Sequence, residues 1–141
     1  MKVDDDFYRE FEHTGDLGIE VSGTSRGEMF SHAVIALSRL MVTPDGIAAR
    51  ESRTIDVAPA SDCDLMHDLL ADALNLFLCD GFIWRDATVT EDERGLHGVL
   101  NGEPFDSNRH QLISELKAVT YHQLSVGCVD GAWRARIIFD V

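Results

Sequence analysis

Basic residues are scarce in this chain. Its 141 residues include 12 Lys and Arg against 25 Asp and Glu, which gives a formal net charge of −13. Neutralisation of phosphates by lysine and arginine supplies most of the affinity of proteins for nucleic acid. The charge balance therefore argues against direct binding to nucleic acid and suits a basic protein partner or bound cations. Taken alone, the same balance is better explained by solubility.

Cysteine is also sparse, and its spacing excludes two kinds of site. Cys63, Cys79 and Cys128 form no C-x-x-C pair. Neither a disulfide framework nor a thiolate zinc site is therefore indicated. We expect reduced, mostly buried thiols in a cytoplasmic protein.

Long apolar runs are absent as well. The first six residues have no apolar core, which excludes a signal peptide, and no run of about 18 apolar residues could span a bilayer. We therefore expect no membrane association. Residues 1–7 are interpreted as a flexible lead-in to one domain that covers residues 1–141, because domains cluster near about 100–150 residues.

Two helices are predicted from helical periodicity and from their end signals. Ser25 opens a capping box before the first helix, which stops at Pro44. Ser61 or Asp62 caps the second helix, which Gly81 closes. Between these ends, leucine and other apolar residues recur at the spacing of one buried helix face.

Strands are predicted for most of the remaining chain. Alternating or β-branched residues favour strands at 17–21, 52–58, 87–91, 96–100 and 133–141. Asp106 could cap a short helix over 107–113. This order predicts an α+β fold, a single compact domain whose mainly antiparallel sheet carries two main helices packed on one face.

Two aspartates stand at strand ends that are far apart in sequence. Asp16 precedes the strand at 17–21, and Asp140 is the last side chain but one of the strand at 133–141. If these strands are neighbours, Asp16, Asp140 and the main-chain oxygens of Val141 form an oxygen-only ligand set that suits Ca²⁺ or Mg²⁺. Alternatively, Asp16 caps a turn and Asp140 pairs with a nearby arginine. Spacing alone favours this alternative.

Two further residues close to these segments carry chemistry. His13 could be a metal ligand, a donor that orients a ligand, or a turn residue, and the poor match of nitrogen to calcium favours the last two. Lys117 could reach a phosphate or a partner's carboxylate, although a lone lysine at a strand start is usually solvated. No G-x-S-x-G elbow, phosphate loop or His-rich zinc signature occurs, so hydrolase chemistry is not indicated.

Four segments, in order along the chain, closely resemble the signature segments of the archease family. They are HTGDLGI at 13–19, GEPFD at 102–106, ELKAVTYH at 115–122 and WRARIIFDV at 133–141. The resemblance runs from about Tyr8 to Val141. Gly15 stands where the family usually has alanine, which loosens the turn without removing the neighbouring carboxylate.

This resemblance implies an accessory protein, not an enzyme, for the GTP-dependent RNA ligase of the RtcB type in tRNA splicing and RNA repair. Archease is understood to promote guanylylation of the ligase and its multiple turnover. Carried over by motif, Asp16, Asp140 and a main-chain oxygen of Val141 would hold the metal, and Lys117 would serve activation, to which we add His13. The alternatives are a stand-alone small metal-dependent enzyme and a chaperone-like binding protein.

Overall fold

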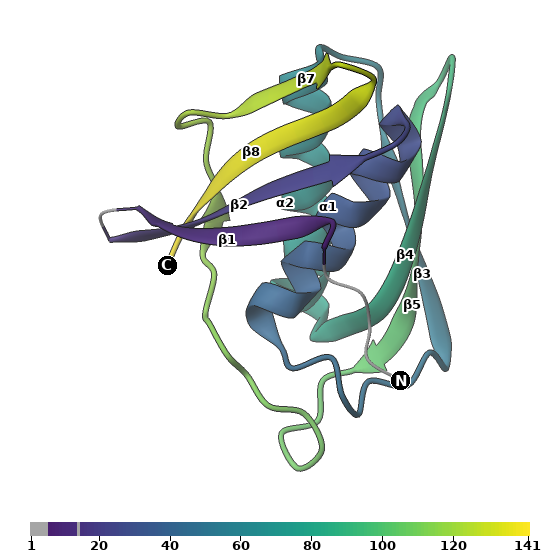
Figure 1. Cartoon of the computed structure of the whole chain (residues 1–141). Helices are drawn as coiled ribbons and strands as arrows, with labels where there is room; N and C mark the ends of the chain where they lie inside the picture. Colours follow the sequence, from purple (N-terminus) through teal and green to yellow (C-terminus); the bar gives the residue numbers. More distant parts are fainter. Residues whose placement is uncertain (1–5, 14) are drawn as a thin grey trace.

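A computed structural model describes residues 6–13 and 15–141, without the side chain of His13 (Figure 1). The elements within these residues are β1 (Tyr8–His13), β2 (Asp16–Gly23), α1 (Arg26–Met41), β3 (Glu51–Val57), α2 (Asp62–Asp80), β4 (Phe82–Asp92), β5 (Gly95–Pro104), β6 (Ala118–Val119), β7 (Ser125–Val129) and β8 (Ala132–Asp140). The predicted α+β class with two helices is confirmed.

The strands form two antiparallel sheets. The five-stranded sheet has the order β1-β2-β8-β6, with β7 also paired to β8, and the three-stranded sheet has the order β3-β5-β4. Helix α1 contacts β2 of the first sheet and β4 of the second. Figure 1 shows both helices behind the five-stranded sheet, with the three-stranded sheet along the right-hand side. One face of the five-stranded sheet therefore faces the helices, and the other faces outward.

Both helices begin and end close to the residues that their end signals indicate. The Ser25 hydroxyl accepts from the backbone N–H of Glu28 at 3.1 Å, and Glu28 reaches back to the N–H of Thr24 at 2.8 Å. The Ser61 hydroxyl accepts from the N–H of Asp64 at 3.2 Å. Gly81 closes α2 in the left-handed conformation at φ +66°. These contacts satisfy backbone groups that helix ends leave without intrahelical partners.

The described residues share one hydrophobic core. It combines Ile137 and Phe139 of β8 with the buried faces of both helices and with Trp84 of β4. The Trp84 side chain is fully buried, and its indole N–H donates to the carbonyl oxygen of Val34 in α1 at 2.8 Å. The core therefore fixes both sheets to the same pair of helices.

Two predictions about local structure are wrong. Instead of a helix over 107–113, the chain makes one turn, in which the N–H of His110 donates to the carbonyl oxygen of Asp106 at 2.8 Å, and then runs along the end of α1. The thiols are not mostly buried, since Cys79 and Cys128 are exposed and Cys63 is half-buried.

The ends of the chain add two observations. Residues 1–5 of the predicted lead-in lie outside the described residues, whereas the Phe7 ring stacks on His32 of α1 with 4.2 Å between ring centroids. Strand β1, which follows, was not predicted. Neither of the two helices in the described part of the chain has the length and apolar character needed to cross a membrane.

Candidate functional site

The two aspartates singled out in the sequence lie directly opposite each other. Strands β2 and β8 are antiparallel neighbours, and their register pairs Asp16 with Asp140. The predicted adjacency of these strands is therefore confirmed. Residues that are opposite in such a pair have Cβ atoms about 4.5–5.5 Å apart, close enough for two carboxylates to share one cation.

Side-chain alternation assigns this pair to the outward face of the sheet. Leu17 and Phe139, the next pair along, lie in the row whose side chains pack toward the helices, and Phe139 is fully buried. Successive side chains on a strand point to opposite faces. Asp16 is consequently half-buried and Asp140 exposed, each on the solvent side of the sheet.

Strand β6 brings Lys117 to the same end of the sheet. Ala118 pairs with Asp140 on the side away from β2, and the backbone N–H of Lys117 donates to the carbonyl oxygen of Asp140 at 2.8 Å. The Lys117 residue is exposed. Three of the residues implied by the family resemblance therefore meet at one end of the five-stranded sheet.

The arginines of β8 do not neutralise Asp140. Arg136 is 3.3 Å from a carboxylate oxygen of Glu20 instead. Arg134 lies six residues from Asp140 along β8, which is about 20 Å in a strand. Within the described residues, no ion pair to Asp140 is present. Like charges directly opposite each other in a sheet are destabilising unless a cation or a proton intervenes.

A hollow of about 760 Å³ adjoins the pair. It is lined by Glu12, Asp16, Glu115 and Val141, together with Gly15, Leu17 and Ser114. Three of these residues carry carboxylates, and Val141 is 46% exposed. The hollow gives solvent, or part of a partner, access to Asp16 and Val141.

The oxygen donors at the Asp16–Asp140 end fit a hard cation whose shell is only partly supplied by the protein. Among the side chains of residues 6–12 and 15–141, no three of His, Cys, Asp or Glu are arranged to hold a metal ion. Asp16 and Asp140 supply only oxygen, and Ca²⁺ accepts irregular shells that main-chain oxygens and water complete. The backbone of His13 pairs with Asp16 in the β1–β2 register, but its side chain is not described.

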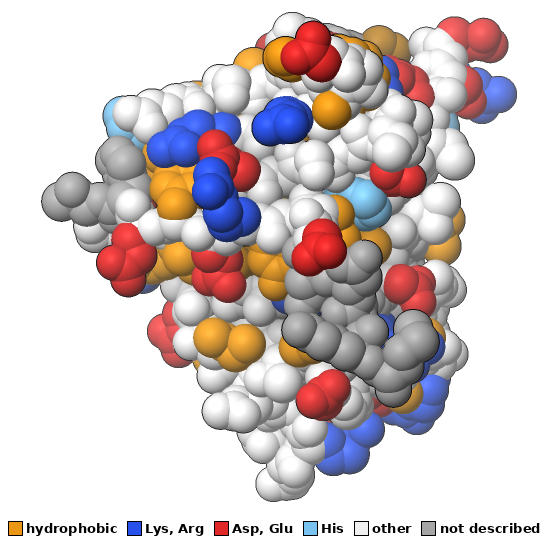
Figure 2. All heavy atoms as spheres, in the orientation of Figure 1, with side chains coloured by type: hydrophobic (Ala, Val, Ile, Leu, Met, Phe, Trp, Pro, Cys, Tyr) orange, Lys and Arg blue, Asp and Glu red, His pale blue; other side chains and the backbone are white. Residues whose placement is uncertain are grey.

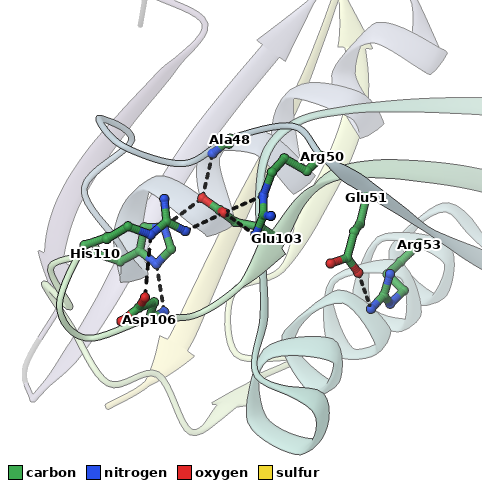
Figure 3. Close-up of polar contacts among 8 residues, drawn as sticks. Ala48, Arg50, Glu51, Arg53, Glu103, Asp106 and His110 are labelled. Atoms are coloured by element: carbon green, nitrogen blue, oxygen red, sulfur yellow. Dashed lines mark hydrogen bonds and ion pairs between the residues drawn. The ribbon is translucent and has the colours of Figure 1, made fainter.

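A buried carboxylate that the sequence did not single out organises the long segment before β6. Glu103, at the end of β5, is fully buried. Its carboxylate accepts from the N–H of Ala48 at 2.7 Å, from Arg50 at 3.1 Å, from Arg109 at 2.5 Å and from His110 at 2.9 Å. Figure 3 shows Ala48, Arg50 and His110 around this carboxylate. Chiefly the hydrogen bond from Arg109, and then that from Ala48, lowers the pKa of Glu103 to about 2.

This arrangement positions the candidate site indirectly. His110 also accepts from the N–H of Asp106 at 2.8 Å, so the turn that follows β5 is held at both ends. The same chain segment continues to Lys117 and β6. The available signal was a glutamate within the GEPFD segment, followed six residues later by Arg109 and seven residues later by His110.

A second cluster joins α2 to the loop that follows β6. The Tyr121 hydroxyl donates to Asp64 at 2.8 Å, and this hydrogen bond raises the pKa of Tyr121 to about 12. The His67 ring stacks on Tyr121 with 4.1 Å between centroids. Asp64 and His67 therefore hold this loop against α2.

Comparison with known proteins finds similarity along almost the whole chain. A model of the Archease protein family (MTH1598/TM1083) matches residues 8–141. The chain is 33% identical over 138 residues to Protein archease of Methanopyrus kandleri, covering 95% of this chain and 99% of that protein. It is 30% identical over 139 residues to Protein archease of Pyrococcus abyssi, covering 95% and 98%.

Two solved structures have the same fold. The solution structure of protein 1598 of Methanobacterium thermoautotrophicum is similar at a TM-score of 0.77 and 27% identity, covering 96% of this chain and 99% of that one. The crystal structure of an archease and possible chaperone from Thermotoga maritima is similar at a TM-score of 0.66 and 23% identity, covering 94% and 96%. The second likeness concerns the fold alone.

Proposed function

The chain belongs to the archease family, and from that premise we propose that it is an accessory protein of a GTP-dependent RNA ligase of the RtcB type. In this proposal the protein promotes guanylylation of the ligase and its multiple turnover in tRNA splicing and RNA repair. It acts in the cytoplasm and catalyses no reaction of its own.

The pairing of Asp16 with Asp140 is the observation that supports this function most directly. The family resemblance implies a metal held by these two residues and an activating role for Lys117. The register of β2 with β8, and the hydrogen bond from Lys117 to the Asp140 backbone, bring all three to one exposed end of a sheet. A surface of this kind can enter the nucleotide site of a partner enzyme.

The chemistry of this end is charge neutralisation and positioning. Asp16, Asp140 and a main-chain oxygen of Val141 would hold Ca²⁺ or Mg²⁺, which when bound supplies positive charge close to the phosphates of GTP. Lys117 adds a flexible cation that can bind a phosphate or a carboxylate of the ligase. Transfer of a nucleotidyl or phosphoryl group depends largely on such positioning and charge compensation.

The charge of the whole chain fits a partner that handles the RNA itself. At −13, the chain would repel a polyanion over most of its surface. An activator of the ligase needs contact only with the enzyme. We therefore expect no direct binding of RNA.

Repeated ligation by the partner enzyme provides the functional test. Asp16→Asn, Asp140→Asn and Lys117→Ala should each lower the multiple-turnover rate by at least tenfold, because each removes a charge at the activating end. Asp80→Asn, an exposed aspartate at the end of α2, is the matched control, and Lys117→Arg should retain part of the activity. Wild-type rates from all three site variants would reject the assignment.

Calorimetric titration with Ca²⁺ and Mg²⁺ tests the metal site without the ligase. The wild type and Asp80→Asn should bind, and Asp16→Asn and Asp140→Asn should not. An assay without added ligase tests the alternative of a stand-alone metal-dependent enzyme, because such an enzyme would turn over by itself. A protein that binds no cation yet activates the ligase would remove the metal from the proposal and leave the accessory role.

A further inference from the structure

The outward face of β8 changes from positive to negative along its length. Its alternate residues on this face are Arg134, Arg136, Ile138 and Asp140. Figure 2, which views this face, shows Lys and Arg side chains gathered toward its upper left. The candidate metal end therefore lies at one end of this surface, and an arginine-rich region lies at the other.

The arginine-rich region is a groove of about 540 Å³. Its lining includes Arg9, Arg134 and Arg136 with Glu20 and Ser125, and we call it the arginine groove. Three of the 12 basic residues of a chain with a net charge of −13 converge here. The groove is a local reversal of the charge of the molecule.

The lining of the groove carries two carboxylates, Asp6 and Glu20, against three arginines, which leaves one positive charge in excess. Arg9 and Arg136 both bind Glu20, and chiefly the hydrogen bond from Arg9 lowers the pKa of Glu20. Arg134 is exposed and forms no ion pair with a described residue. The groove thus presents one arginine that is ready to accept a further anion.

An aromatic side chain, Phe11, packs tightly against the sheet beside the groove. The Arg136 guanidinium lies 3.8 Å from the centroid of the Phe11 ring. The Phe11 ring occupies the space that a Cβ on Gly18 would fill, with 2.2 Å between the two. Arginine and aromatic side chains held in fixed positions are enriched at the centres of protein interfaces.

We propose that the arginine groove docks an acidic segment of the partner ligase, and this inference rests on the function proposed above. The groove binds the carboxylates of that segment through Arg134, beside the pair that Arg9 and Arg136 form with Glu20. The docked segment then orients the ligase on the sheet so that its nucleotide site meets the Asp16–Asp140 end. Because the two ends of this surface carry opposite charges, they favour one orientation of the ligase and disfavour the reverse.

A short acidic peptide suits this groove better than RNA does. The groove lies on the face of a sheet, without the helix N-terminus or loop of backbone N–H groups that typically cradles phosphate. A polyanion that extended beyond the groove would meet the negative remainder of the molecule, whereas a few carboxylates would not.

The distance between the candidate metal end and the arginine groove predicts that substitutions at the two places have separate effects. Arg134 and Asp140 are six residues apart on one strand, or about 20 Å. This exceeds the screening length of about 8 Å at physiological ionic strength. Loss of Arg134 should therefore weaken association with the ligase while the activated rate at saturation stays unchanged.

The test compares Arg134→Glu with Arg85→Glu, an exposed arginine on β4 of the other sheet, so that both variants change net charge equally. Affinity for the intact ligase is measured without RNA at low and at physiological salt, and stimulated ligation is titrated in parallel. Arg134→Glu should bind about tenfold more weakly at low salt, with a smaller deficit at higher salt and the same plateau rate. Arg85→Glu should match the wild type.

Three outcomes would overturn the proposal, and they differ from one another. Equal affinities of Arg134→Glu and Arg85→Glu, with normal stimulation by the wild type, remove the groove and leave the proposed function intact. A wild type that neither binds nor stimulates the ligase removes the function and the docking together. A deficit seen only when RNA is present assigns the groove to nucleic acid. Arg134→Gln, which removes charge without reversing it, should show a smaller loss and replaces Arg134→Glu if that variant fails to fold.

Discussion

A single buried carboxylate determines the path of the chain between β5 and β6. Glu103 is fully buried, and its oxygens accept from one backbone N–H, two arginines and His110. A buried anion is tolerated only when such partners replace water. The segment that carries Arg109 and His110 is therefore drawn to the end of β5 instead of continuing as a helix.

Replacing Glu103 by glutamine should destabilise the protein by about 2–4 kcal/mol at pH 7, because Arg50, Arg109 and the buried His110 lose the anion that they contact. The pKa of Glu103 is lowered from 4.5 to about 2 in the folded protein. Its contribution is therefore complete above about pH 4.5 and is lost as the pH falls toward 2. Urea unfolding at several pH values should show the gap between wild type and Glu103→Gln closing over that window.

The exposed Glu93, in the turn between β4 and β5, supplies the control for this experiment. Glu93→Gln should leave both the midpoint and its pH dependence close to the wild type, since exposed substitutions usually change stability by less than about 0.5 kcal/mol. A gap for Glu103→Gln that stayed constant from pH 7 to pH 3 would contradict the assignment of an ionised Glu103.

Residue identity alone predicted one group of site residues and missed another. Asp16 and Asp140 attracted notice because a carboxylate at a strand end suggests a cation. The signal for Glu103, its place in the GEPFD segment before Arg109 and His110, was weaker, because its partners Ala48 and Arg50 are brought to it only by the fold. A polar residue in a buried network is recognised by its partners, and those are separated from it in sequence.

At the scale of elements, local signals were sufficient for the helices. The hydroxyls of Ser25 and Ser61 cap them, and the αL glycine at 81 ends the second. The predicted helix over 107–113 failed because long-range contacts prevailed: the N–H of Ile113 donates to the carbonyl oxygen of Met41 at 2.7 Å. β1 was missed because its residues Tyr8–His13 do not alternate cleanly between apolar and polar.

Substitution of Gly81 tests how much the left-handed backbone at the end of α2 contributes to stability, apart from any effect on side-chain packing. A Cβ at Gly81 would meet nothing within 4 Å, but the residue has φ +66°. Gly81→Ala should therefore lower the free energy of unfolding by about 1 kcal/mol through the strain of a left-handed alanine. Chemical denaturation of the purified variant measures the change.

Gly127 of β7 is the matched control, because a Cβ there also meets nothing within 4 Å and its φ is not in the positive range. Gly127→Ala should leave stability unchanged or raise it by about 0.5–1 kcal/mol, since alanine restricts the unfolded chain. Equal losses from the two substitutions would show that the left-handed backbone of Gly81 does not set the cost.

At the scale of the whole molecule, the sequence indicated the class of fold but not that the strands divide between two sheets. Strands β2 and β8 pair although they lie near opposite ends of the sequence, and the hydrophobic pattern of a strand does not name its partner. The family resemblance supported the conclusion that Asp16 and Asp140 act together. The strands form two sheets, and α1 contacts β2 of one and β4 of the other.

Because α1 and α2 contribute to the core of both sheets, neither sheet should unfold alone. The two tryptophans permit a direct test, since Trp84 lies in β4 and Trp133 in β8. Trp133→Phe leaves a fluorescence probe only in the three-stranded sheet, and Trp84→Phe leaves one only in the five-stranded sheet. In each variant, the urea midpoint from fluorescence should coincide with that from far-UV circular dichroism, whatever the stability lost. Fluorescence of Trp133 that changed at lower urea than the dichroism would instead make the five-stranded sheet, with the candidate metal end and the arginine groove, a separately unfolding unit.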